Sequence, residues 1–349
     1  MKICHVINSL SGGGAETHLL DLVYAQKELG HTVNVIATGP DKKNMKSFDK
    51  EFTYASDDVL RLYFPRLLNL YSYVKFFKHL QKEQFDVVHT HQPRSDFMYF
   101  ILNFFTSFKP TWIVSIHGKY DTYLEGSLFF DKLRKLSMPL LVKIWNKSDH
   151  IICISKEVEK WLTIYKIKSR TSVINYWINN AKLENLEKTK ESINIGFMGR
   201  INKNKGIEDL LEAHEELNED RYSLFIAGSG KESYLKKLNE RYDLKNVNFL
   251  GYISNKDKFF SNIDIFVFPS YSEGLGLALL ESMSYSKICI SRDVPPMNRI
   301  LNHDSGYLFQ NIEELKSIIL DCGYLYKEDL LSLNKKLSNQ YNLLNEKYN

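Results

Sequence analysis

The chain has 349 residues, enough for two domains of ordinary size, and its 44% hydrophobic and 25% charged residues are typical of a soluble globular protein. No apolar stretch reaches the roughly 18–20 residues that a membrane-spanning helix needs, and the apolar N-terminal run is too short for a signal peptide, so we expect a cytoplasmic protein. The net charge of +4 is uneven: residues 1–180 carry 24 Lys and Arg against 17 Asp and Glu, and the remainder carries 22 against 25. The basic excess comes without a nucleic-acid-binding motif, which argues against DNA or RNA as a partner.

The N-terminal segment predicts a strand, a glycine loop and a helix. Lys2–Asn8 is a short apolar run, and the loop SLSGGG follows at Ser9–Gly14. Ala15–Leu29 then has helical periodicity, and Thr32–Thr38 alternates like a second strand. Glycines in such a loop let the backbone approach a ligand closely, as in nucleotide-binding folds. Because the G-x-G-x-x-G spacing is missing and no acidic residue ends the second strand, a dinucleotide is not indicated.

Two later segments of this half mix apolar and basic residues. Leu60–Lys82 follows a polar, lysine-rich surface segment, Pro40–Asp58, and predicts a helix packed on the sheet. Ser127–Lys147 predicts an amphipathic helix with a basic face. The alternative for both is a helix lying on anionic lipid, so peripheral contact with the inner face of the cell membrane stays open.

Three histidines stand at or near predicted strand ends. Asp86–Thr90 reads as a buried strand leading into His91, and His89 shares one strand face with His91 because they are two residues apart. His117 follows the predicted strand Thr111–Ile116, at the end where open α/β sheets bind ligands. A zinc site of all three histidines is an alternative, but no cysteine or carboxylate completes it at a recognisable spacing. We expect no metal, a hydrogen-bonded core role for His89 and a site role for His117.

The strand–helix pattern restarts after a polar stretch, residues 180–192, that suits an interdomain linker. Ile193–Gly199 predicts a strand, and Arg200 and Lys205 follow it in one strand-to-helix loop. Two cations in such a loop can hold a diphosphate by charge-assisted hydrogen bonds. The alternative is a pair of ordinary surface cations, and their place at a strand end favours the diphosphate.

The stretch YSEGLGLALLES, Tyr271–Ser282, follows the buried strand predicted at Ile263–Pro269. Its two glycines lead into a helix whose first backbone N–H groups can bind a phosphate. Glu273 and Glu281, with seven residues between them, can accept hydrogen bonds from two sets of ligand hydroxyls. Hydroxyl groups on both sides of a phosphate describe a sugar nucleotide.

Three motifs, GGGAE, R-x4-K-G and E-G-x-G-x4-E, together resemble the retaining glycosyltransferases of family 4, which have the GT-B fold. The resemblance implies an α/β protein with two Rossmann-like, doubly wound domains facing across a cleft. Residues 1–178 would form the acceptor-binding domain and residues 190–324 the donor-binding domain, with a helix at about 325–349 packing back on the first. It also implies that no metal or other cofactor takes part.

The same resemblance assigns the site residues. Arg200 and Lys205 match the family's diphosphate ligands, and Glu273 the ligand of the donor-sugar hydroxyls. His117 would lie near the donor sugar and the acceptor, which makes these four the catalytic candidates. The turn at Gly251 would lie beside the nucleobase. The other donor-binding candidates are Gly13, Gly14, Tyr252, Gly274, Leu275, Gly276, Leu277 and Glu281, the last of them for the ribose.

The sequence therefore predicts a retaining glycosyltransferase that moves a sugar from a nucleotide sugar, most simply a UDP-sugar, to a saccharide or lipid-linked saccharide of a bacterial surface glycan. Two alternatives stay open. One is a nucleotide-sugar epimerase or hydrolase with the same fold. The other is a non-catalytic subunit that binds nucleotide sugars.

Overall fold

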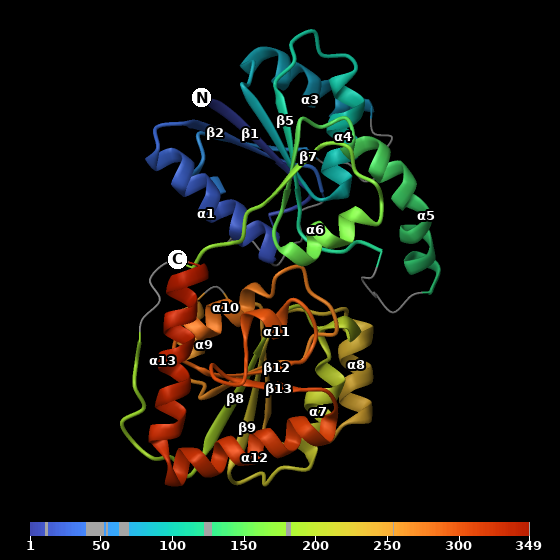
Figure 1. The fold of residues 1–349 in the computed structure, drawn as a ribbon. Coiled ribbons are helices and arrows are strands. Elements are labelled where there is room, and N and C mark those ends of the chain that lie inside the picture. Colours follow the sequence, from blue (N-terminus) through green and yellow to red (C-terminus); the bar gives the residue numbers. More distant parts are fainter. Residues whose placement is uncertain are drawn as a thin grey trace. The chain divides into compact units, whose positions relative to one another are not determined.

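Strands and helices alternate along the chain and build two parallel sheets in this computed structural model (Figure 1). The structure describes residues 1–10, 13–39, 52–53, 55–62, 70–121, 128–178, 183–253 and 255–348. Met1–Asp121 and Leu133–Asn175 form one compact unit, and the residues from Tyr176 onward, together with residues 128–132 of the described chain, form the other. Both units are doubly wound α/β domains, as the sequence predicts.

The sheet of the first unit has the order β3-β2-β1-β4-β5-β6-β7, and all its strands are parallel. Its strands are β1 (Lys2–Ile7), β2 (Thr32–Ala37), β3 (Asp58–Arg61), β4 (Val87–His91), β5 (Thr111–Ile116), β6 (His150–Cys153) and β7 (Arg170–Val173). The helices are α1 (Gly14–Glu28), α3 (Leu70–Glu83), α4 (Pro93–Asn103), α5 (Leu128–Trp145) and α6 (Lys156–Thr163). The central strands are short, nearly continuous apolar runs because helices cover both faces of such a sheet.

The second unit repeats this arrangement with the strand order β10-β9-β8-β11-β12-β13. Its strands are β8 (Ile193–Met198), β9 (Tyr222–Ala227), β10 (Val247–Gly251), β11 (Ile265–Phe268), β12 (Ile288–Arg292) and β13 (Tyr307–Phe309). Its helices are the short 3-10 turn η1 (Lys203–Lys205), α7 (Ile207–Glu215), α8 (Glu232–Arg241), α9 (Lys256–Ser261), α10 (Leu277–Ser284), α11 (Met297–Ile300), α12 (Ile312–Glu328) and α13 (Leu330–Lys347). Buried Ile, Leu, Val and Phe side chains of the central strands pack with those of α7 and α12 in one core.

A helix is predicted for most of Leu60–Lys82, and the structure has α3 at Leu70–Glu83, with residues 63–69 outside the described part. Leu60 and Arg61 instead belong to strand β3, Asp58–Arg61, which the sequence did not predict. β3 is a short edge strand that pairs with β2. Its sequence, DVLR, is too short and too polar for its pattern to predict a strand. Most of Pro40–Asp58 also lies outside the described residues, but Phe52 and Ala55 are buried in the core rather than on the surface.

The chain is held to the second unit before its first strand begins. The backbone N–H of Leu186 donates to Asn334 Oδ1 at 2.7 Å, and that of Lys190 to the carbonyl of Tyr326 at 3.1 Å, so the described end of the predicted linker is anchored there. The C-terminal tail is helical as predicted: α13 packs against α10, α12 and β12 of this unit. Its predicted return to the first unit stays a prediction. Among the described residues, no helix has the length and apolar character to cross a bilayer.

Candidate functional site

In each sheet the chain reverses its direction of winding between two central strands. In the second unit these strands are β8 and β11, which lie side by side although they are far apart in sequence. Ligands of such sheets bind beyond the carboxyl ends of the strands at this switch point. Arg200 stands two residues after β8, and Glu273 stands five residues after β11. The topology therefore brings the R-x4-K-G and E-G-x-G-x4-E motifs into neighbouring loops.

Asn204 fastens these two loops to each other. Its carbonyl oxygen accepts from the N–H of Tyr271 at 2.9 Å, and its side-chain Nδ2 donates to the carbonyl of Ser272 at 2.9 Å. Two buried polar atoms, Asn204 Oδ1 and Ser270 Oγ, have no hydrogen-bond partner among the described residues. Sequence reasoning missed Asn204, because an asparagine between two lysines in a loop carries no signal of its own.

Lys205 and Glu273, which the sequence assigns to different parts of one ligand, form an ion pair between Nζ and Oε1. Both side chains are only 14% exposed, so the pair is largely shielded from solvent screening. The ammonium group also lies 5.6 Å from the centre of the Phe268 ring. The structure thus places a cation and a carboxylate next to each other at the end of β11.

Glycines shape the backbone on both sides of this pair. Gly206, with a φ of 65°, links η1 to α7, and a Cβ there would collide with the carbonyl oxygen of Pro269. Gly276 has a φ of 91° and precedes the first residue of α10, Leu277. Both conformations are left-handed, which glycine adopts without the steric cost that other residues meet. The first turn of α10 carries no acidic side chain, so its N–H groups favour an anion.

The remaining donor-binding candidates of this unit lie at two further places. Glu281 forms an ion pair with Lys256, with 2.6 Å between Oε1 and Nζ, and the Glu281 side chain is 13% exposed. Gly251 ends β10, and its carbonyl accepts from the N–H of Gly228 at 2.7 Å, while a Cβ on Gly228 would collide with the carbonyl of Gly199. The ends of β8, β9 and β10 therefore approach one another closely at three glycines. Tyr252 follows directly on this edge, Leu275 is buried, and Gly274 lies beside Glu273.

A buried arginine outside the three sequence motifs holds the same loop in place. Arg292, at the end of β12, donates from Nε to the carbonyl of Pro269 at 3.0 Å and forms an ion pair with Asp209. Its guanidinium lies 4.2 Å from the centre of the Tyr271 ring, and the Tyr271 hydroxyl donates to the same Asp209 carboxylate at 2.6 Å. Arg292 and Asp209 thereby hold the segment that carries Glu273. Only the pairing of β12 with β11 reveals this role.

The candidates of the first unit lie beyond the carboxyl ends of its strands, near the switch point between β1 and β4. Gly14 begins α1, Gly13 is its N-cap residue, and Ser11 and Gly12 lie outside the described residues. His117 follows β5 directly, and its Nε2 lies 3.1 Å from Nδ1 of His91. Burial lowers the pKa of His117 to about 3, so the ring is neutral at physiological pH. The predicted core role of His89 is consistent with its burial and its 2.7 Å hydrogen bond to Ser115 Oγ.

The first unit also encloses a buried carboxyl group whose ionisation lowers the stability of the folded state. Asp96 in α4 is fully buried; its Oδ2 accepts from the Trp145 Nε1–H at 2.9 Å, and no described residue donates to its Oδ1. Burial raises the pKa of Asp96 to about 7. In the unfolded chain an aspartate loses its proton at about pH 4, so the folded state loses stability as the pH rises from about 4 to about 7.

We expect Asp96→Asn to stabilise the protein at pH 8, by roughly 1–4 kcal/mol, and to have little effect near pH 4. The amide stands in for the protonated acid and keeps the acceptor for Trp145. Thermal denaturation at both pH values measures the difference. Glu28→Gln, at the exposed end of α1, is the control and should act equally at both. A destabilisation by Asp96→Asn that is as large at pH 8 as at pH 4 would contradict this prediction.

Comparison with known families accounts for nearly the whole chain. The family model described as Glycosyltransferase Family 4 matches residues 12–182, and the one described as Glycosyl transferases group 1 matches residues 179–340. An O-antigen biosynthesis glycosyltransferase of Escherichia coli, WclY, is 24% identical over 353 residues, covering 96% of this chain and 92% of that protein. The capsular polysaccharide biosynthesis glycosyltransferase CapM of Staphylococcus aureus is 23% identical and covers 80% of this chain and 77% of its own length.

Two solved structures of differently named proteins have the same fold. Sucrose-phosphate synthase from Thermosynechococcus elongatus superposes with a TM-score of 0.80 at 19% identity, covering 100% of this chain and 95% of that one. The Anabaena protein Alr3699/HepE, in complex with UDP-glucose, gives a TM-score of 0.80 at 18% identity, with 100% and 96% coverage. The two parallel sheets and the two adjoining family matches together identify this chain as a glycosyltransferase of family 4 with the GT-B fold.

Proposed function

We propose that this enzyme transfers a sugar from a UDP-sugar, with retention of the anomeric configuration, to a saccharide acceptor of a surface polysaccharide. The observation that carries the proposal is the Lys205–Glu273 pair beside the N-terminus of α10, at the switch point of the second sheet. The UDP-glucose complex of the Anabaena protein and the polysaccharide biosynthesis names of WclY and CapM support the donor and the acceptor class. Retention rests on the resemblance to family 4 alone.

Each proposed role follows from charge and position. Lys205 and Arg200 neutralise the diphosphate, and the backbone N–H groups at Gly276 and Leu277 add hydrogen bonds to its oxygens. Glu273 orients the hydroxyls of the donor sugar, and Glu281 those of the ribose. When the sugar leaves, negative charge grows on the diphosphate, and fixed donors stabilise it without rearrangement. These groups take the place of a metal ion in the transfer.

The two ion pairs of the site involve the same side chains that are proposed to bind the ligand. A diphosphate that engages Lys205 competes with Glu273 for the ammonium group, and a ribose that engages Glu281 competes with Lys256. Both carboxylates would then turn to ligand hydroxyls, which offer hydrogen bonds in exchange for the lost ion pairs. In the first unit, neutral His117 is proposed to contact the acceptor, and Gly13 and Gly14 stay donor candidates. Gly251 and Tyr252 are proposed for the nucleobase.

We expect UDP-sugars to raise the melting temperature of the protein more than GDP-, ADP- or TDP-sugars, since a ligand that binds the folded state stabilises it. The best donor is then incubated with a panel of saccharides, and proton NMR reads the anomeric configuration of the product. Transfer with the configuration of the donor supports the proposal. An inverted product would exclude retention. Epimerisation or hydrolysis without an acceptor at comparable rates, or binding without any turnover, would replace transfer by one of the alternatives.

We also propose that α5 touches an anionic membrane surface. Leu136 and Leu140 are 68% and 50% exposed one helical turn apart, and the exposed cations Lys132, Lys135 and Lys143 flank them. Apolar side chains bordered by lysines suit the headgroup region of anionic lipid. Sedimentation with vesicles of anionic and of neutral lipid at low salt tests this. Failure of the protein to sediment with the anionic vesicles would remove the proposal.

A further inference from the structure

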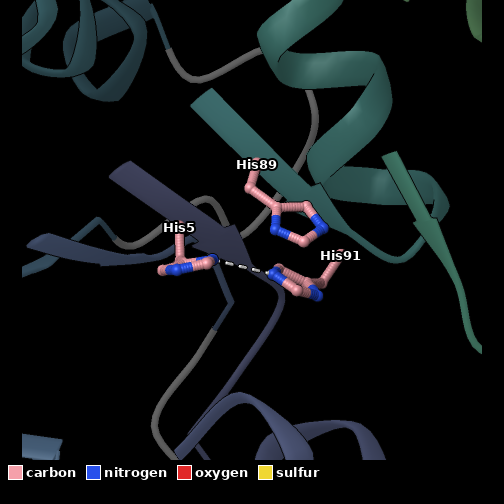
Figure 2. Close-up of side chains that lie close together, drawn as sticks. All are labelled: His5, His89 and His91. Atoms are coloured by element: carbon pink, nitrogen blue, oxygen red, sulfur yellow. Dashed lines mark hydrogen bonds between the residues drawn. The ribbon is translucent and has the colours of Figure 1, made fainter. Parts of the chain in front are cut away.

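Three histidines meet at the switch point of the first sheet (Figure 2). His5 on β1 stands in register with His89 on β4, and His91 follows on the same face of β4. The rings of His89 and His91 have centroids 4.2 Å apart, and His5 lies 5.1 Å and 5.3 Å from them. All three side chains are buried, with at most 5% of any of them exposed. The sequence shows the pair on β4 but not His5, which lies 84 residues earlier.

One nitrogen of each ring faces a hydrogen-bond partner outside the cluster, and the other nitrogen faces the other two histidines. The outward atoms are His5 Nε2, 2.8 Å from Gln26 Oε1, His89 Nε2, 2.7 Å from Ser115 Oγ, and His91 Nδ1, 3.1 Å from His117 Nε2. One nitrogen of each ring lies within 4.8 Å of those of the other two. His5 Nδ1 and His91 Nε2 are the closest pair, 3.1 Å apart, and one nitrogen of His89 faces them in Figure 2.

This arrangement is typical of a metal site. Metal-binding histidines almost always give their second nitrogen to a carbonyl, a carboxylate or another hydrogen-bonding group, which fixes the ring and its tautomer. A Zn²⁺–N bond of about 2.0–2.1 Å places tetrahedral ligand nitrogens about 3.3 Å apart. The closest pair, 3.1 Å apart, is near this spacing, and the His89 nitrogen lies within 4.8 Å of both, so metal binding would draw the three nitrogens together.

The rings are also in the protonation state that a metal requires. Burial lowers the pKa of His5 to about 4 and the pKa values of His89 and His91 well below their ordinary range, so all three are neutral at physiological pH. The cluster contains no carboxylate, which disfavours Mg²⁺ and Ca²⁺, whereas imidazole ligands suit Zn²⁺, Co²⁺ and Ni²⁺. His5 Nε2 donates to Gln26 Oε1, so His5 Nδ1 accepts from the Nε2–H of His91. Metal binding would move this proton to Nδ1 of His91, which then donates to His117 Nε2, with the His117 proton on its own Nδ1.

We propose that His5, His89 and His91 bind one divalent transition-metal ion of the Zn²⁺ class, with water in the fourth position. Gln26 and Ser115 orient the ligand rings and do not themselves touch the ion. The site belongs to the first unit alone and uses none of the residues proposed to hold the nucleotide sugar. Metal binding at this site is therefore separate from the binding of the nucleotide sugar.

Titration of the full-length, chelator-treated protein with Co²⁺ tests the proposal, because tetrahedral Co²⁺ absorbs visible light strongly and Zn²⁺ displaces it. We expect one Co²⁺ per chain and a loss of affinity of about 100-fold or more in His5→Gln, His89→Gln and His91→Gln. His150→Gln is the matched control: His150 lies in the same sheet on β6 and contacts a serine hydroxyl, Ser172, as His89 contacts Ser115. It should bind Co²⁺ as the unchanged protein does.

Gln26→Leu separates metal binding from a purely structural role of the cluster. Loss of the partner of His5 Nε2 should weaken Co²⁺ binding by about 10–100-fold while the circular dichroism spectrum stays the same. Zn²⁺ should raise the melting temperature of the unchanged protein and not that of His89→Gln. Absence of the cobalt band, or a band equally strong in His89→Gln, would overturn the proposal. No nucleotide sugar is used, so the result is independent of the transfer experiments.

Discussion

Lys205→Met should lower kcat/KM for sugar transfer by about 10²–10³-fold while the fold stays intact. The methionine keeps most of the length and apolar stem of the lysine but removes the charge that is proposed to stabilise the leaving diphosphate. It also leaves the carboxylate of Glu273, only 14% exposed, without its cation. Because this loss falls on the charge that develops during the reaction, kcat should fall and not KM alone. Steady-state kinetics with saturating acceptor measures both.

Lys203→Met is the matched control, since Lys203 lies in the same turn η1 but is exposed to solvent. It should keep nearly full activity. Arg200→Ala and Glu273→Ala should each abolish most of the transfer, with circular dichroism unchanged. Turnover close to normal in Lys205→Met, Arg200→Ala and Glu273→Ala would show that the transferred sugar is not held at this end of the sheet.

Gly206→Ala should destabilise the second unit by about 2–4 kcal/mol and should reduce transfer as well. Gly206 has a φ of 65°, and the added methyl group would meet the carbonyl oxygen of Pro269 at the end of β11. To relieve that contact, the turn that carries Lys205 must move away from the loop that carries Glu273. Chemical denaturation measures the stability, and activity below the midpoint of unfolding measures the displacement of Lys205.

Gly251→Ala is the control for stability, because Gly251 has nearly the same φ, 68°, but nothing lies within 4 Å of an added Cβ. Only the left-handed conformation would cost free energy there, about 1 kcal/mol. Equal losses of stability in the two variants would show that the close approach of Gly206 to Pro269 does not matter. A Gly206→Ala variant with unchanged stability would contradict the prediction outright.

Local sequence patterns were sufficient for the strands at the centre of each sheet. Thr111–Ile116 is predicted and observed with the same bounds, and Ile263–Pro269 contains the observed strand Ile265–Phe268. These strands are buried on both faces, so their apolar runs are short and end sharply at polar or glycine residues. The strand Asp58–Arg61 was not predicted. It lies at the edge of the sheet as far as the structure describes it, and its sequence is correspondingly polar.

The fold class, the family and the loops that carry the candidate residues were predictable from the amino-acid order, because they depend on periodicity and on spacing within single motifs. Which side chains meet is seen only in the folded chain: Lys205 with Glu273, Glu281 with Lys256, and His5 with His91. The partners in these pairs lie 68, 25 and 86 residues apart in the chain. A parallel sheet joins strands through long crossovers, so its neighbours at a switch point have no fixed separation in sequence that a motif could record.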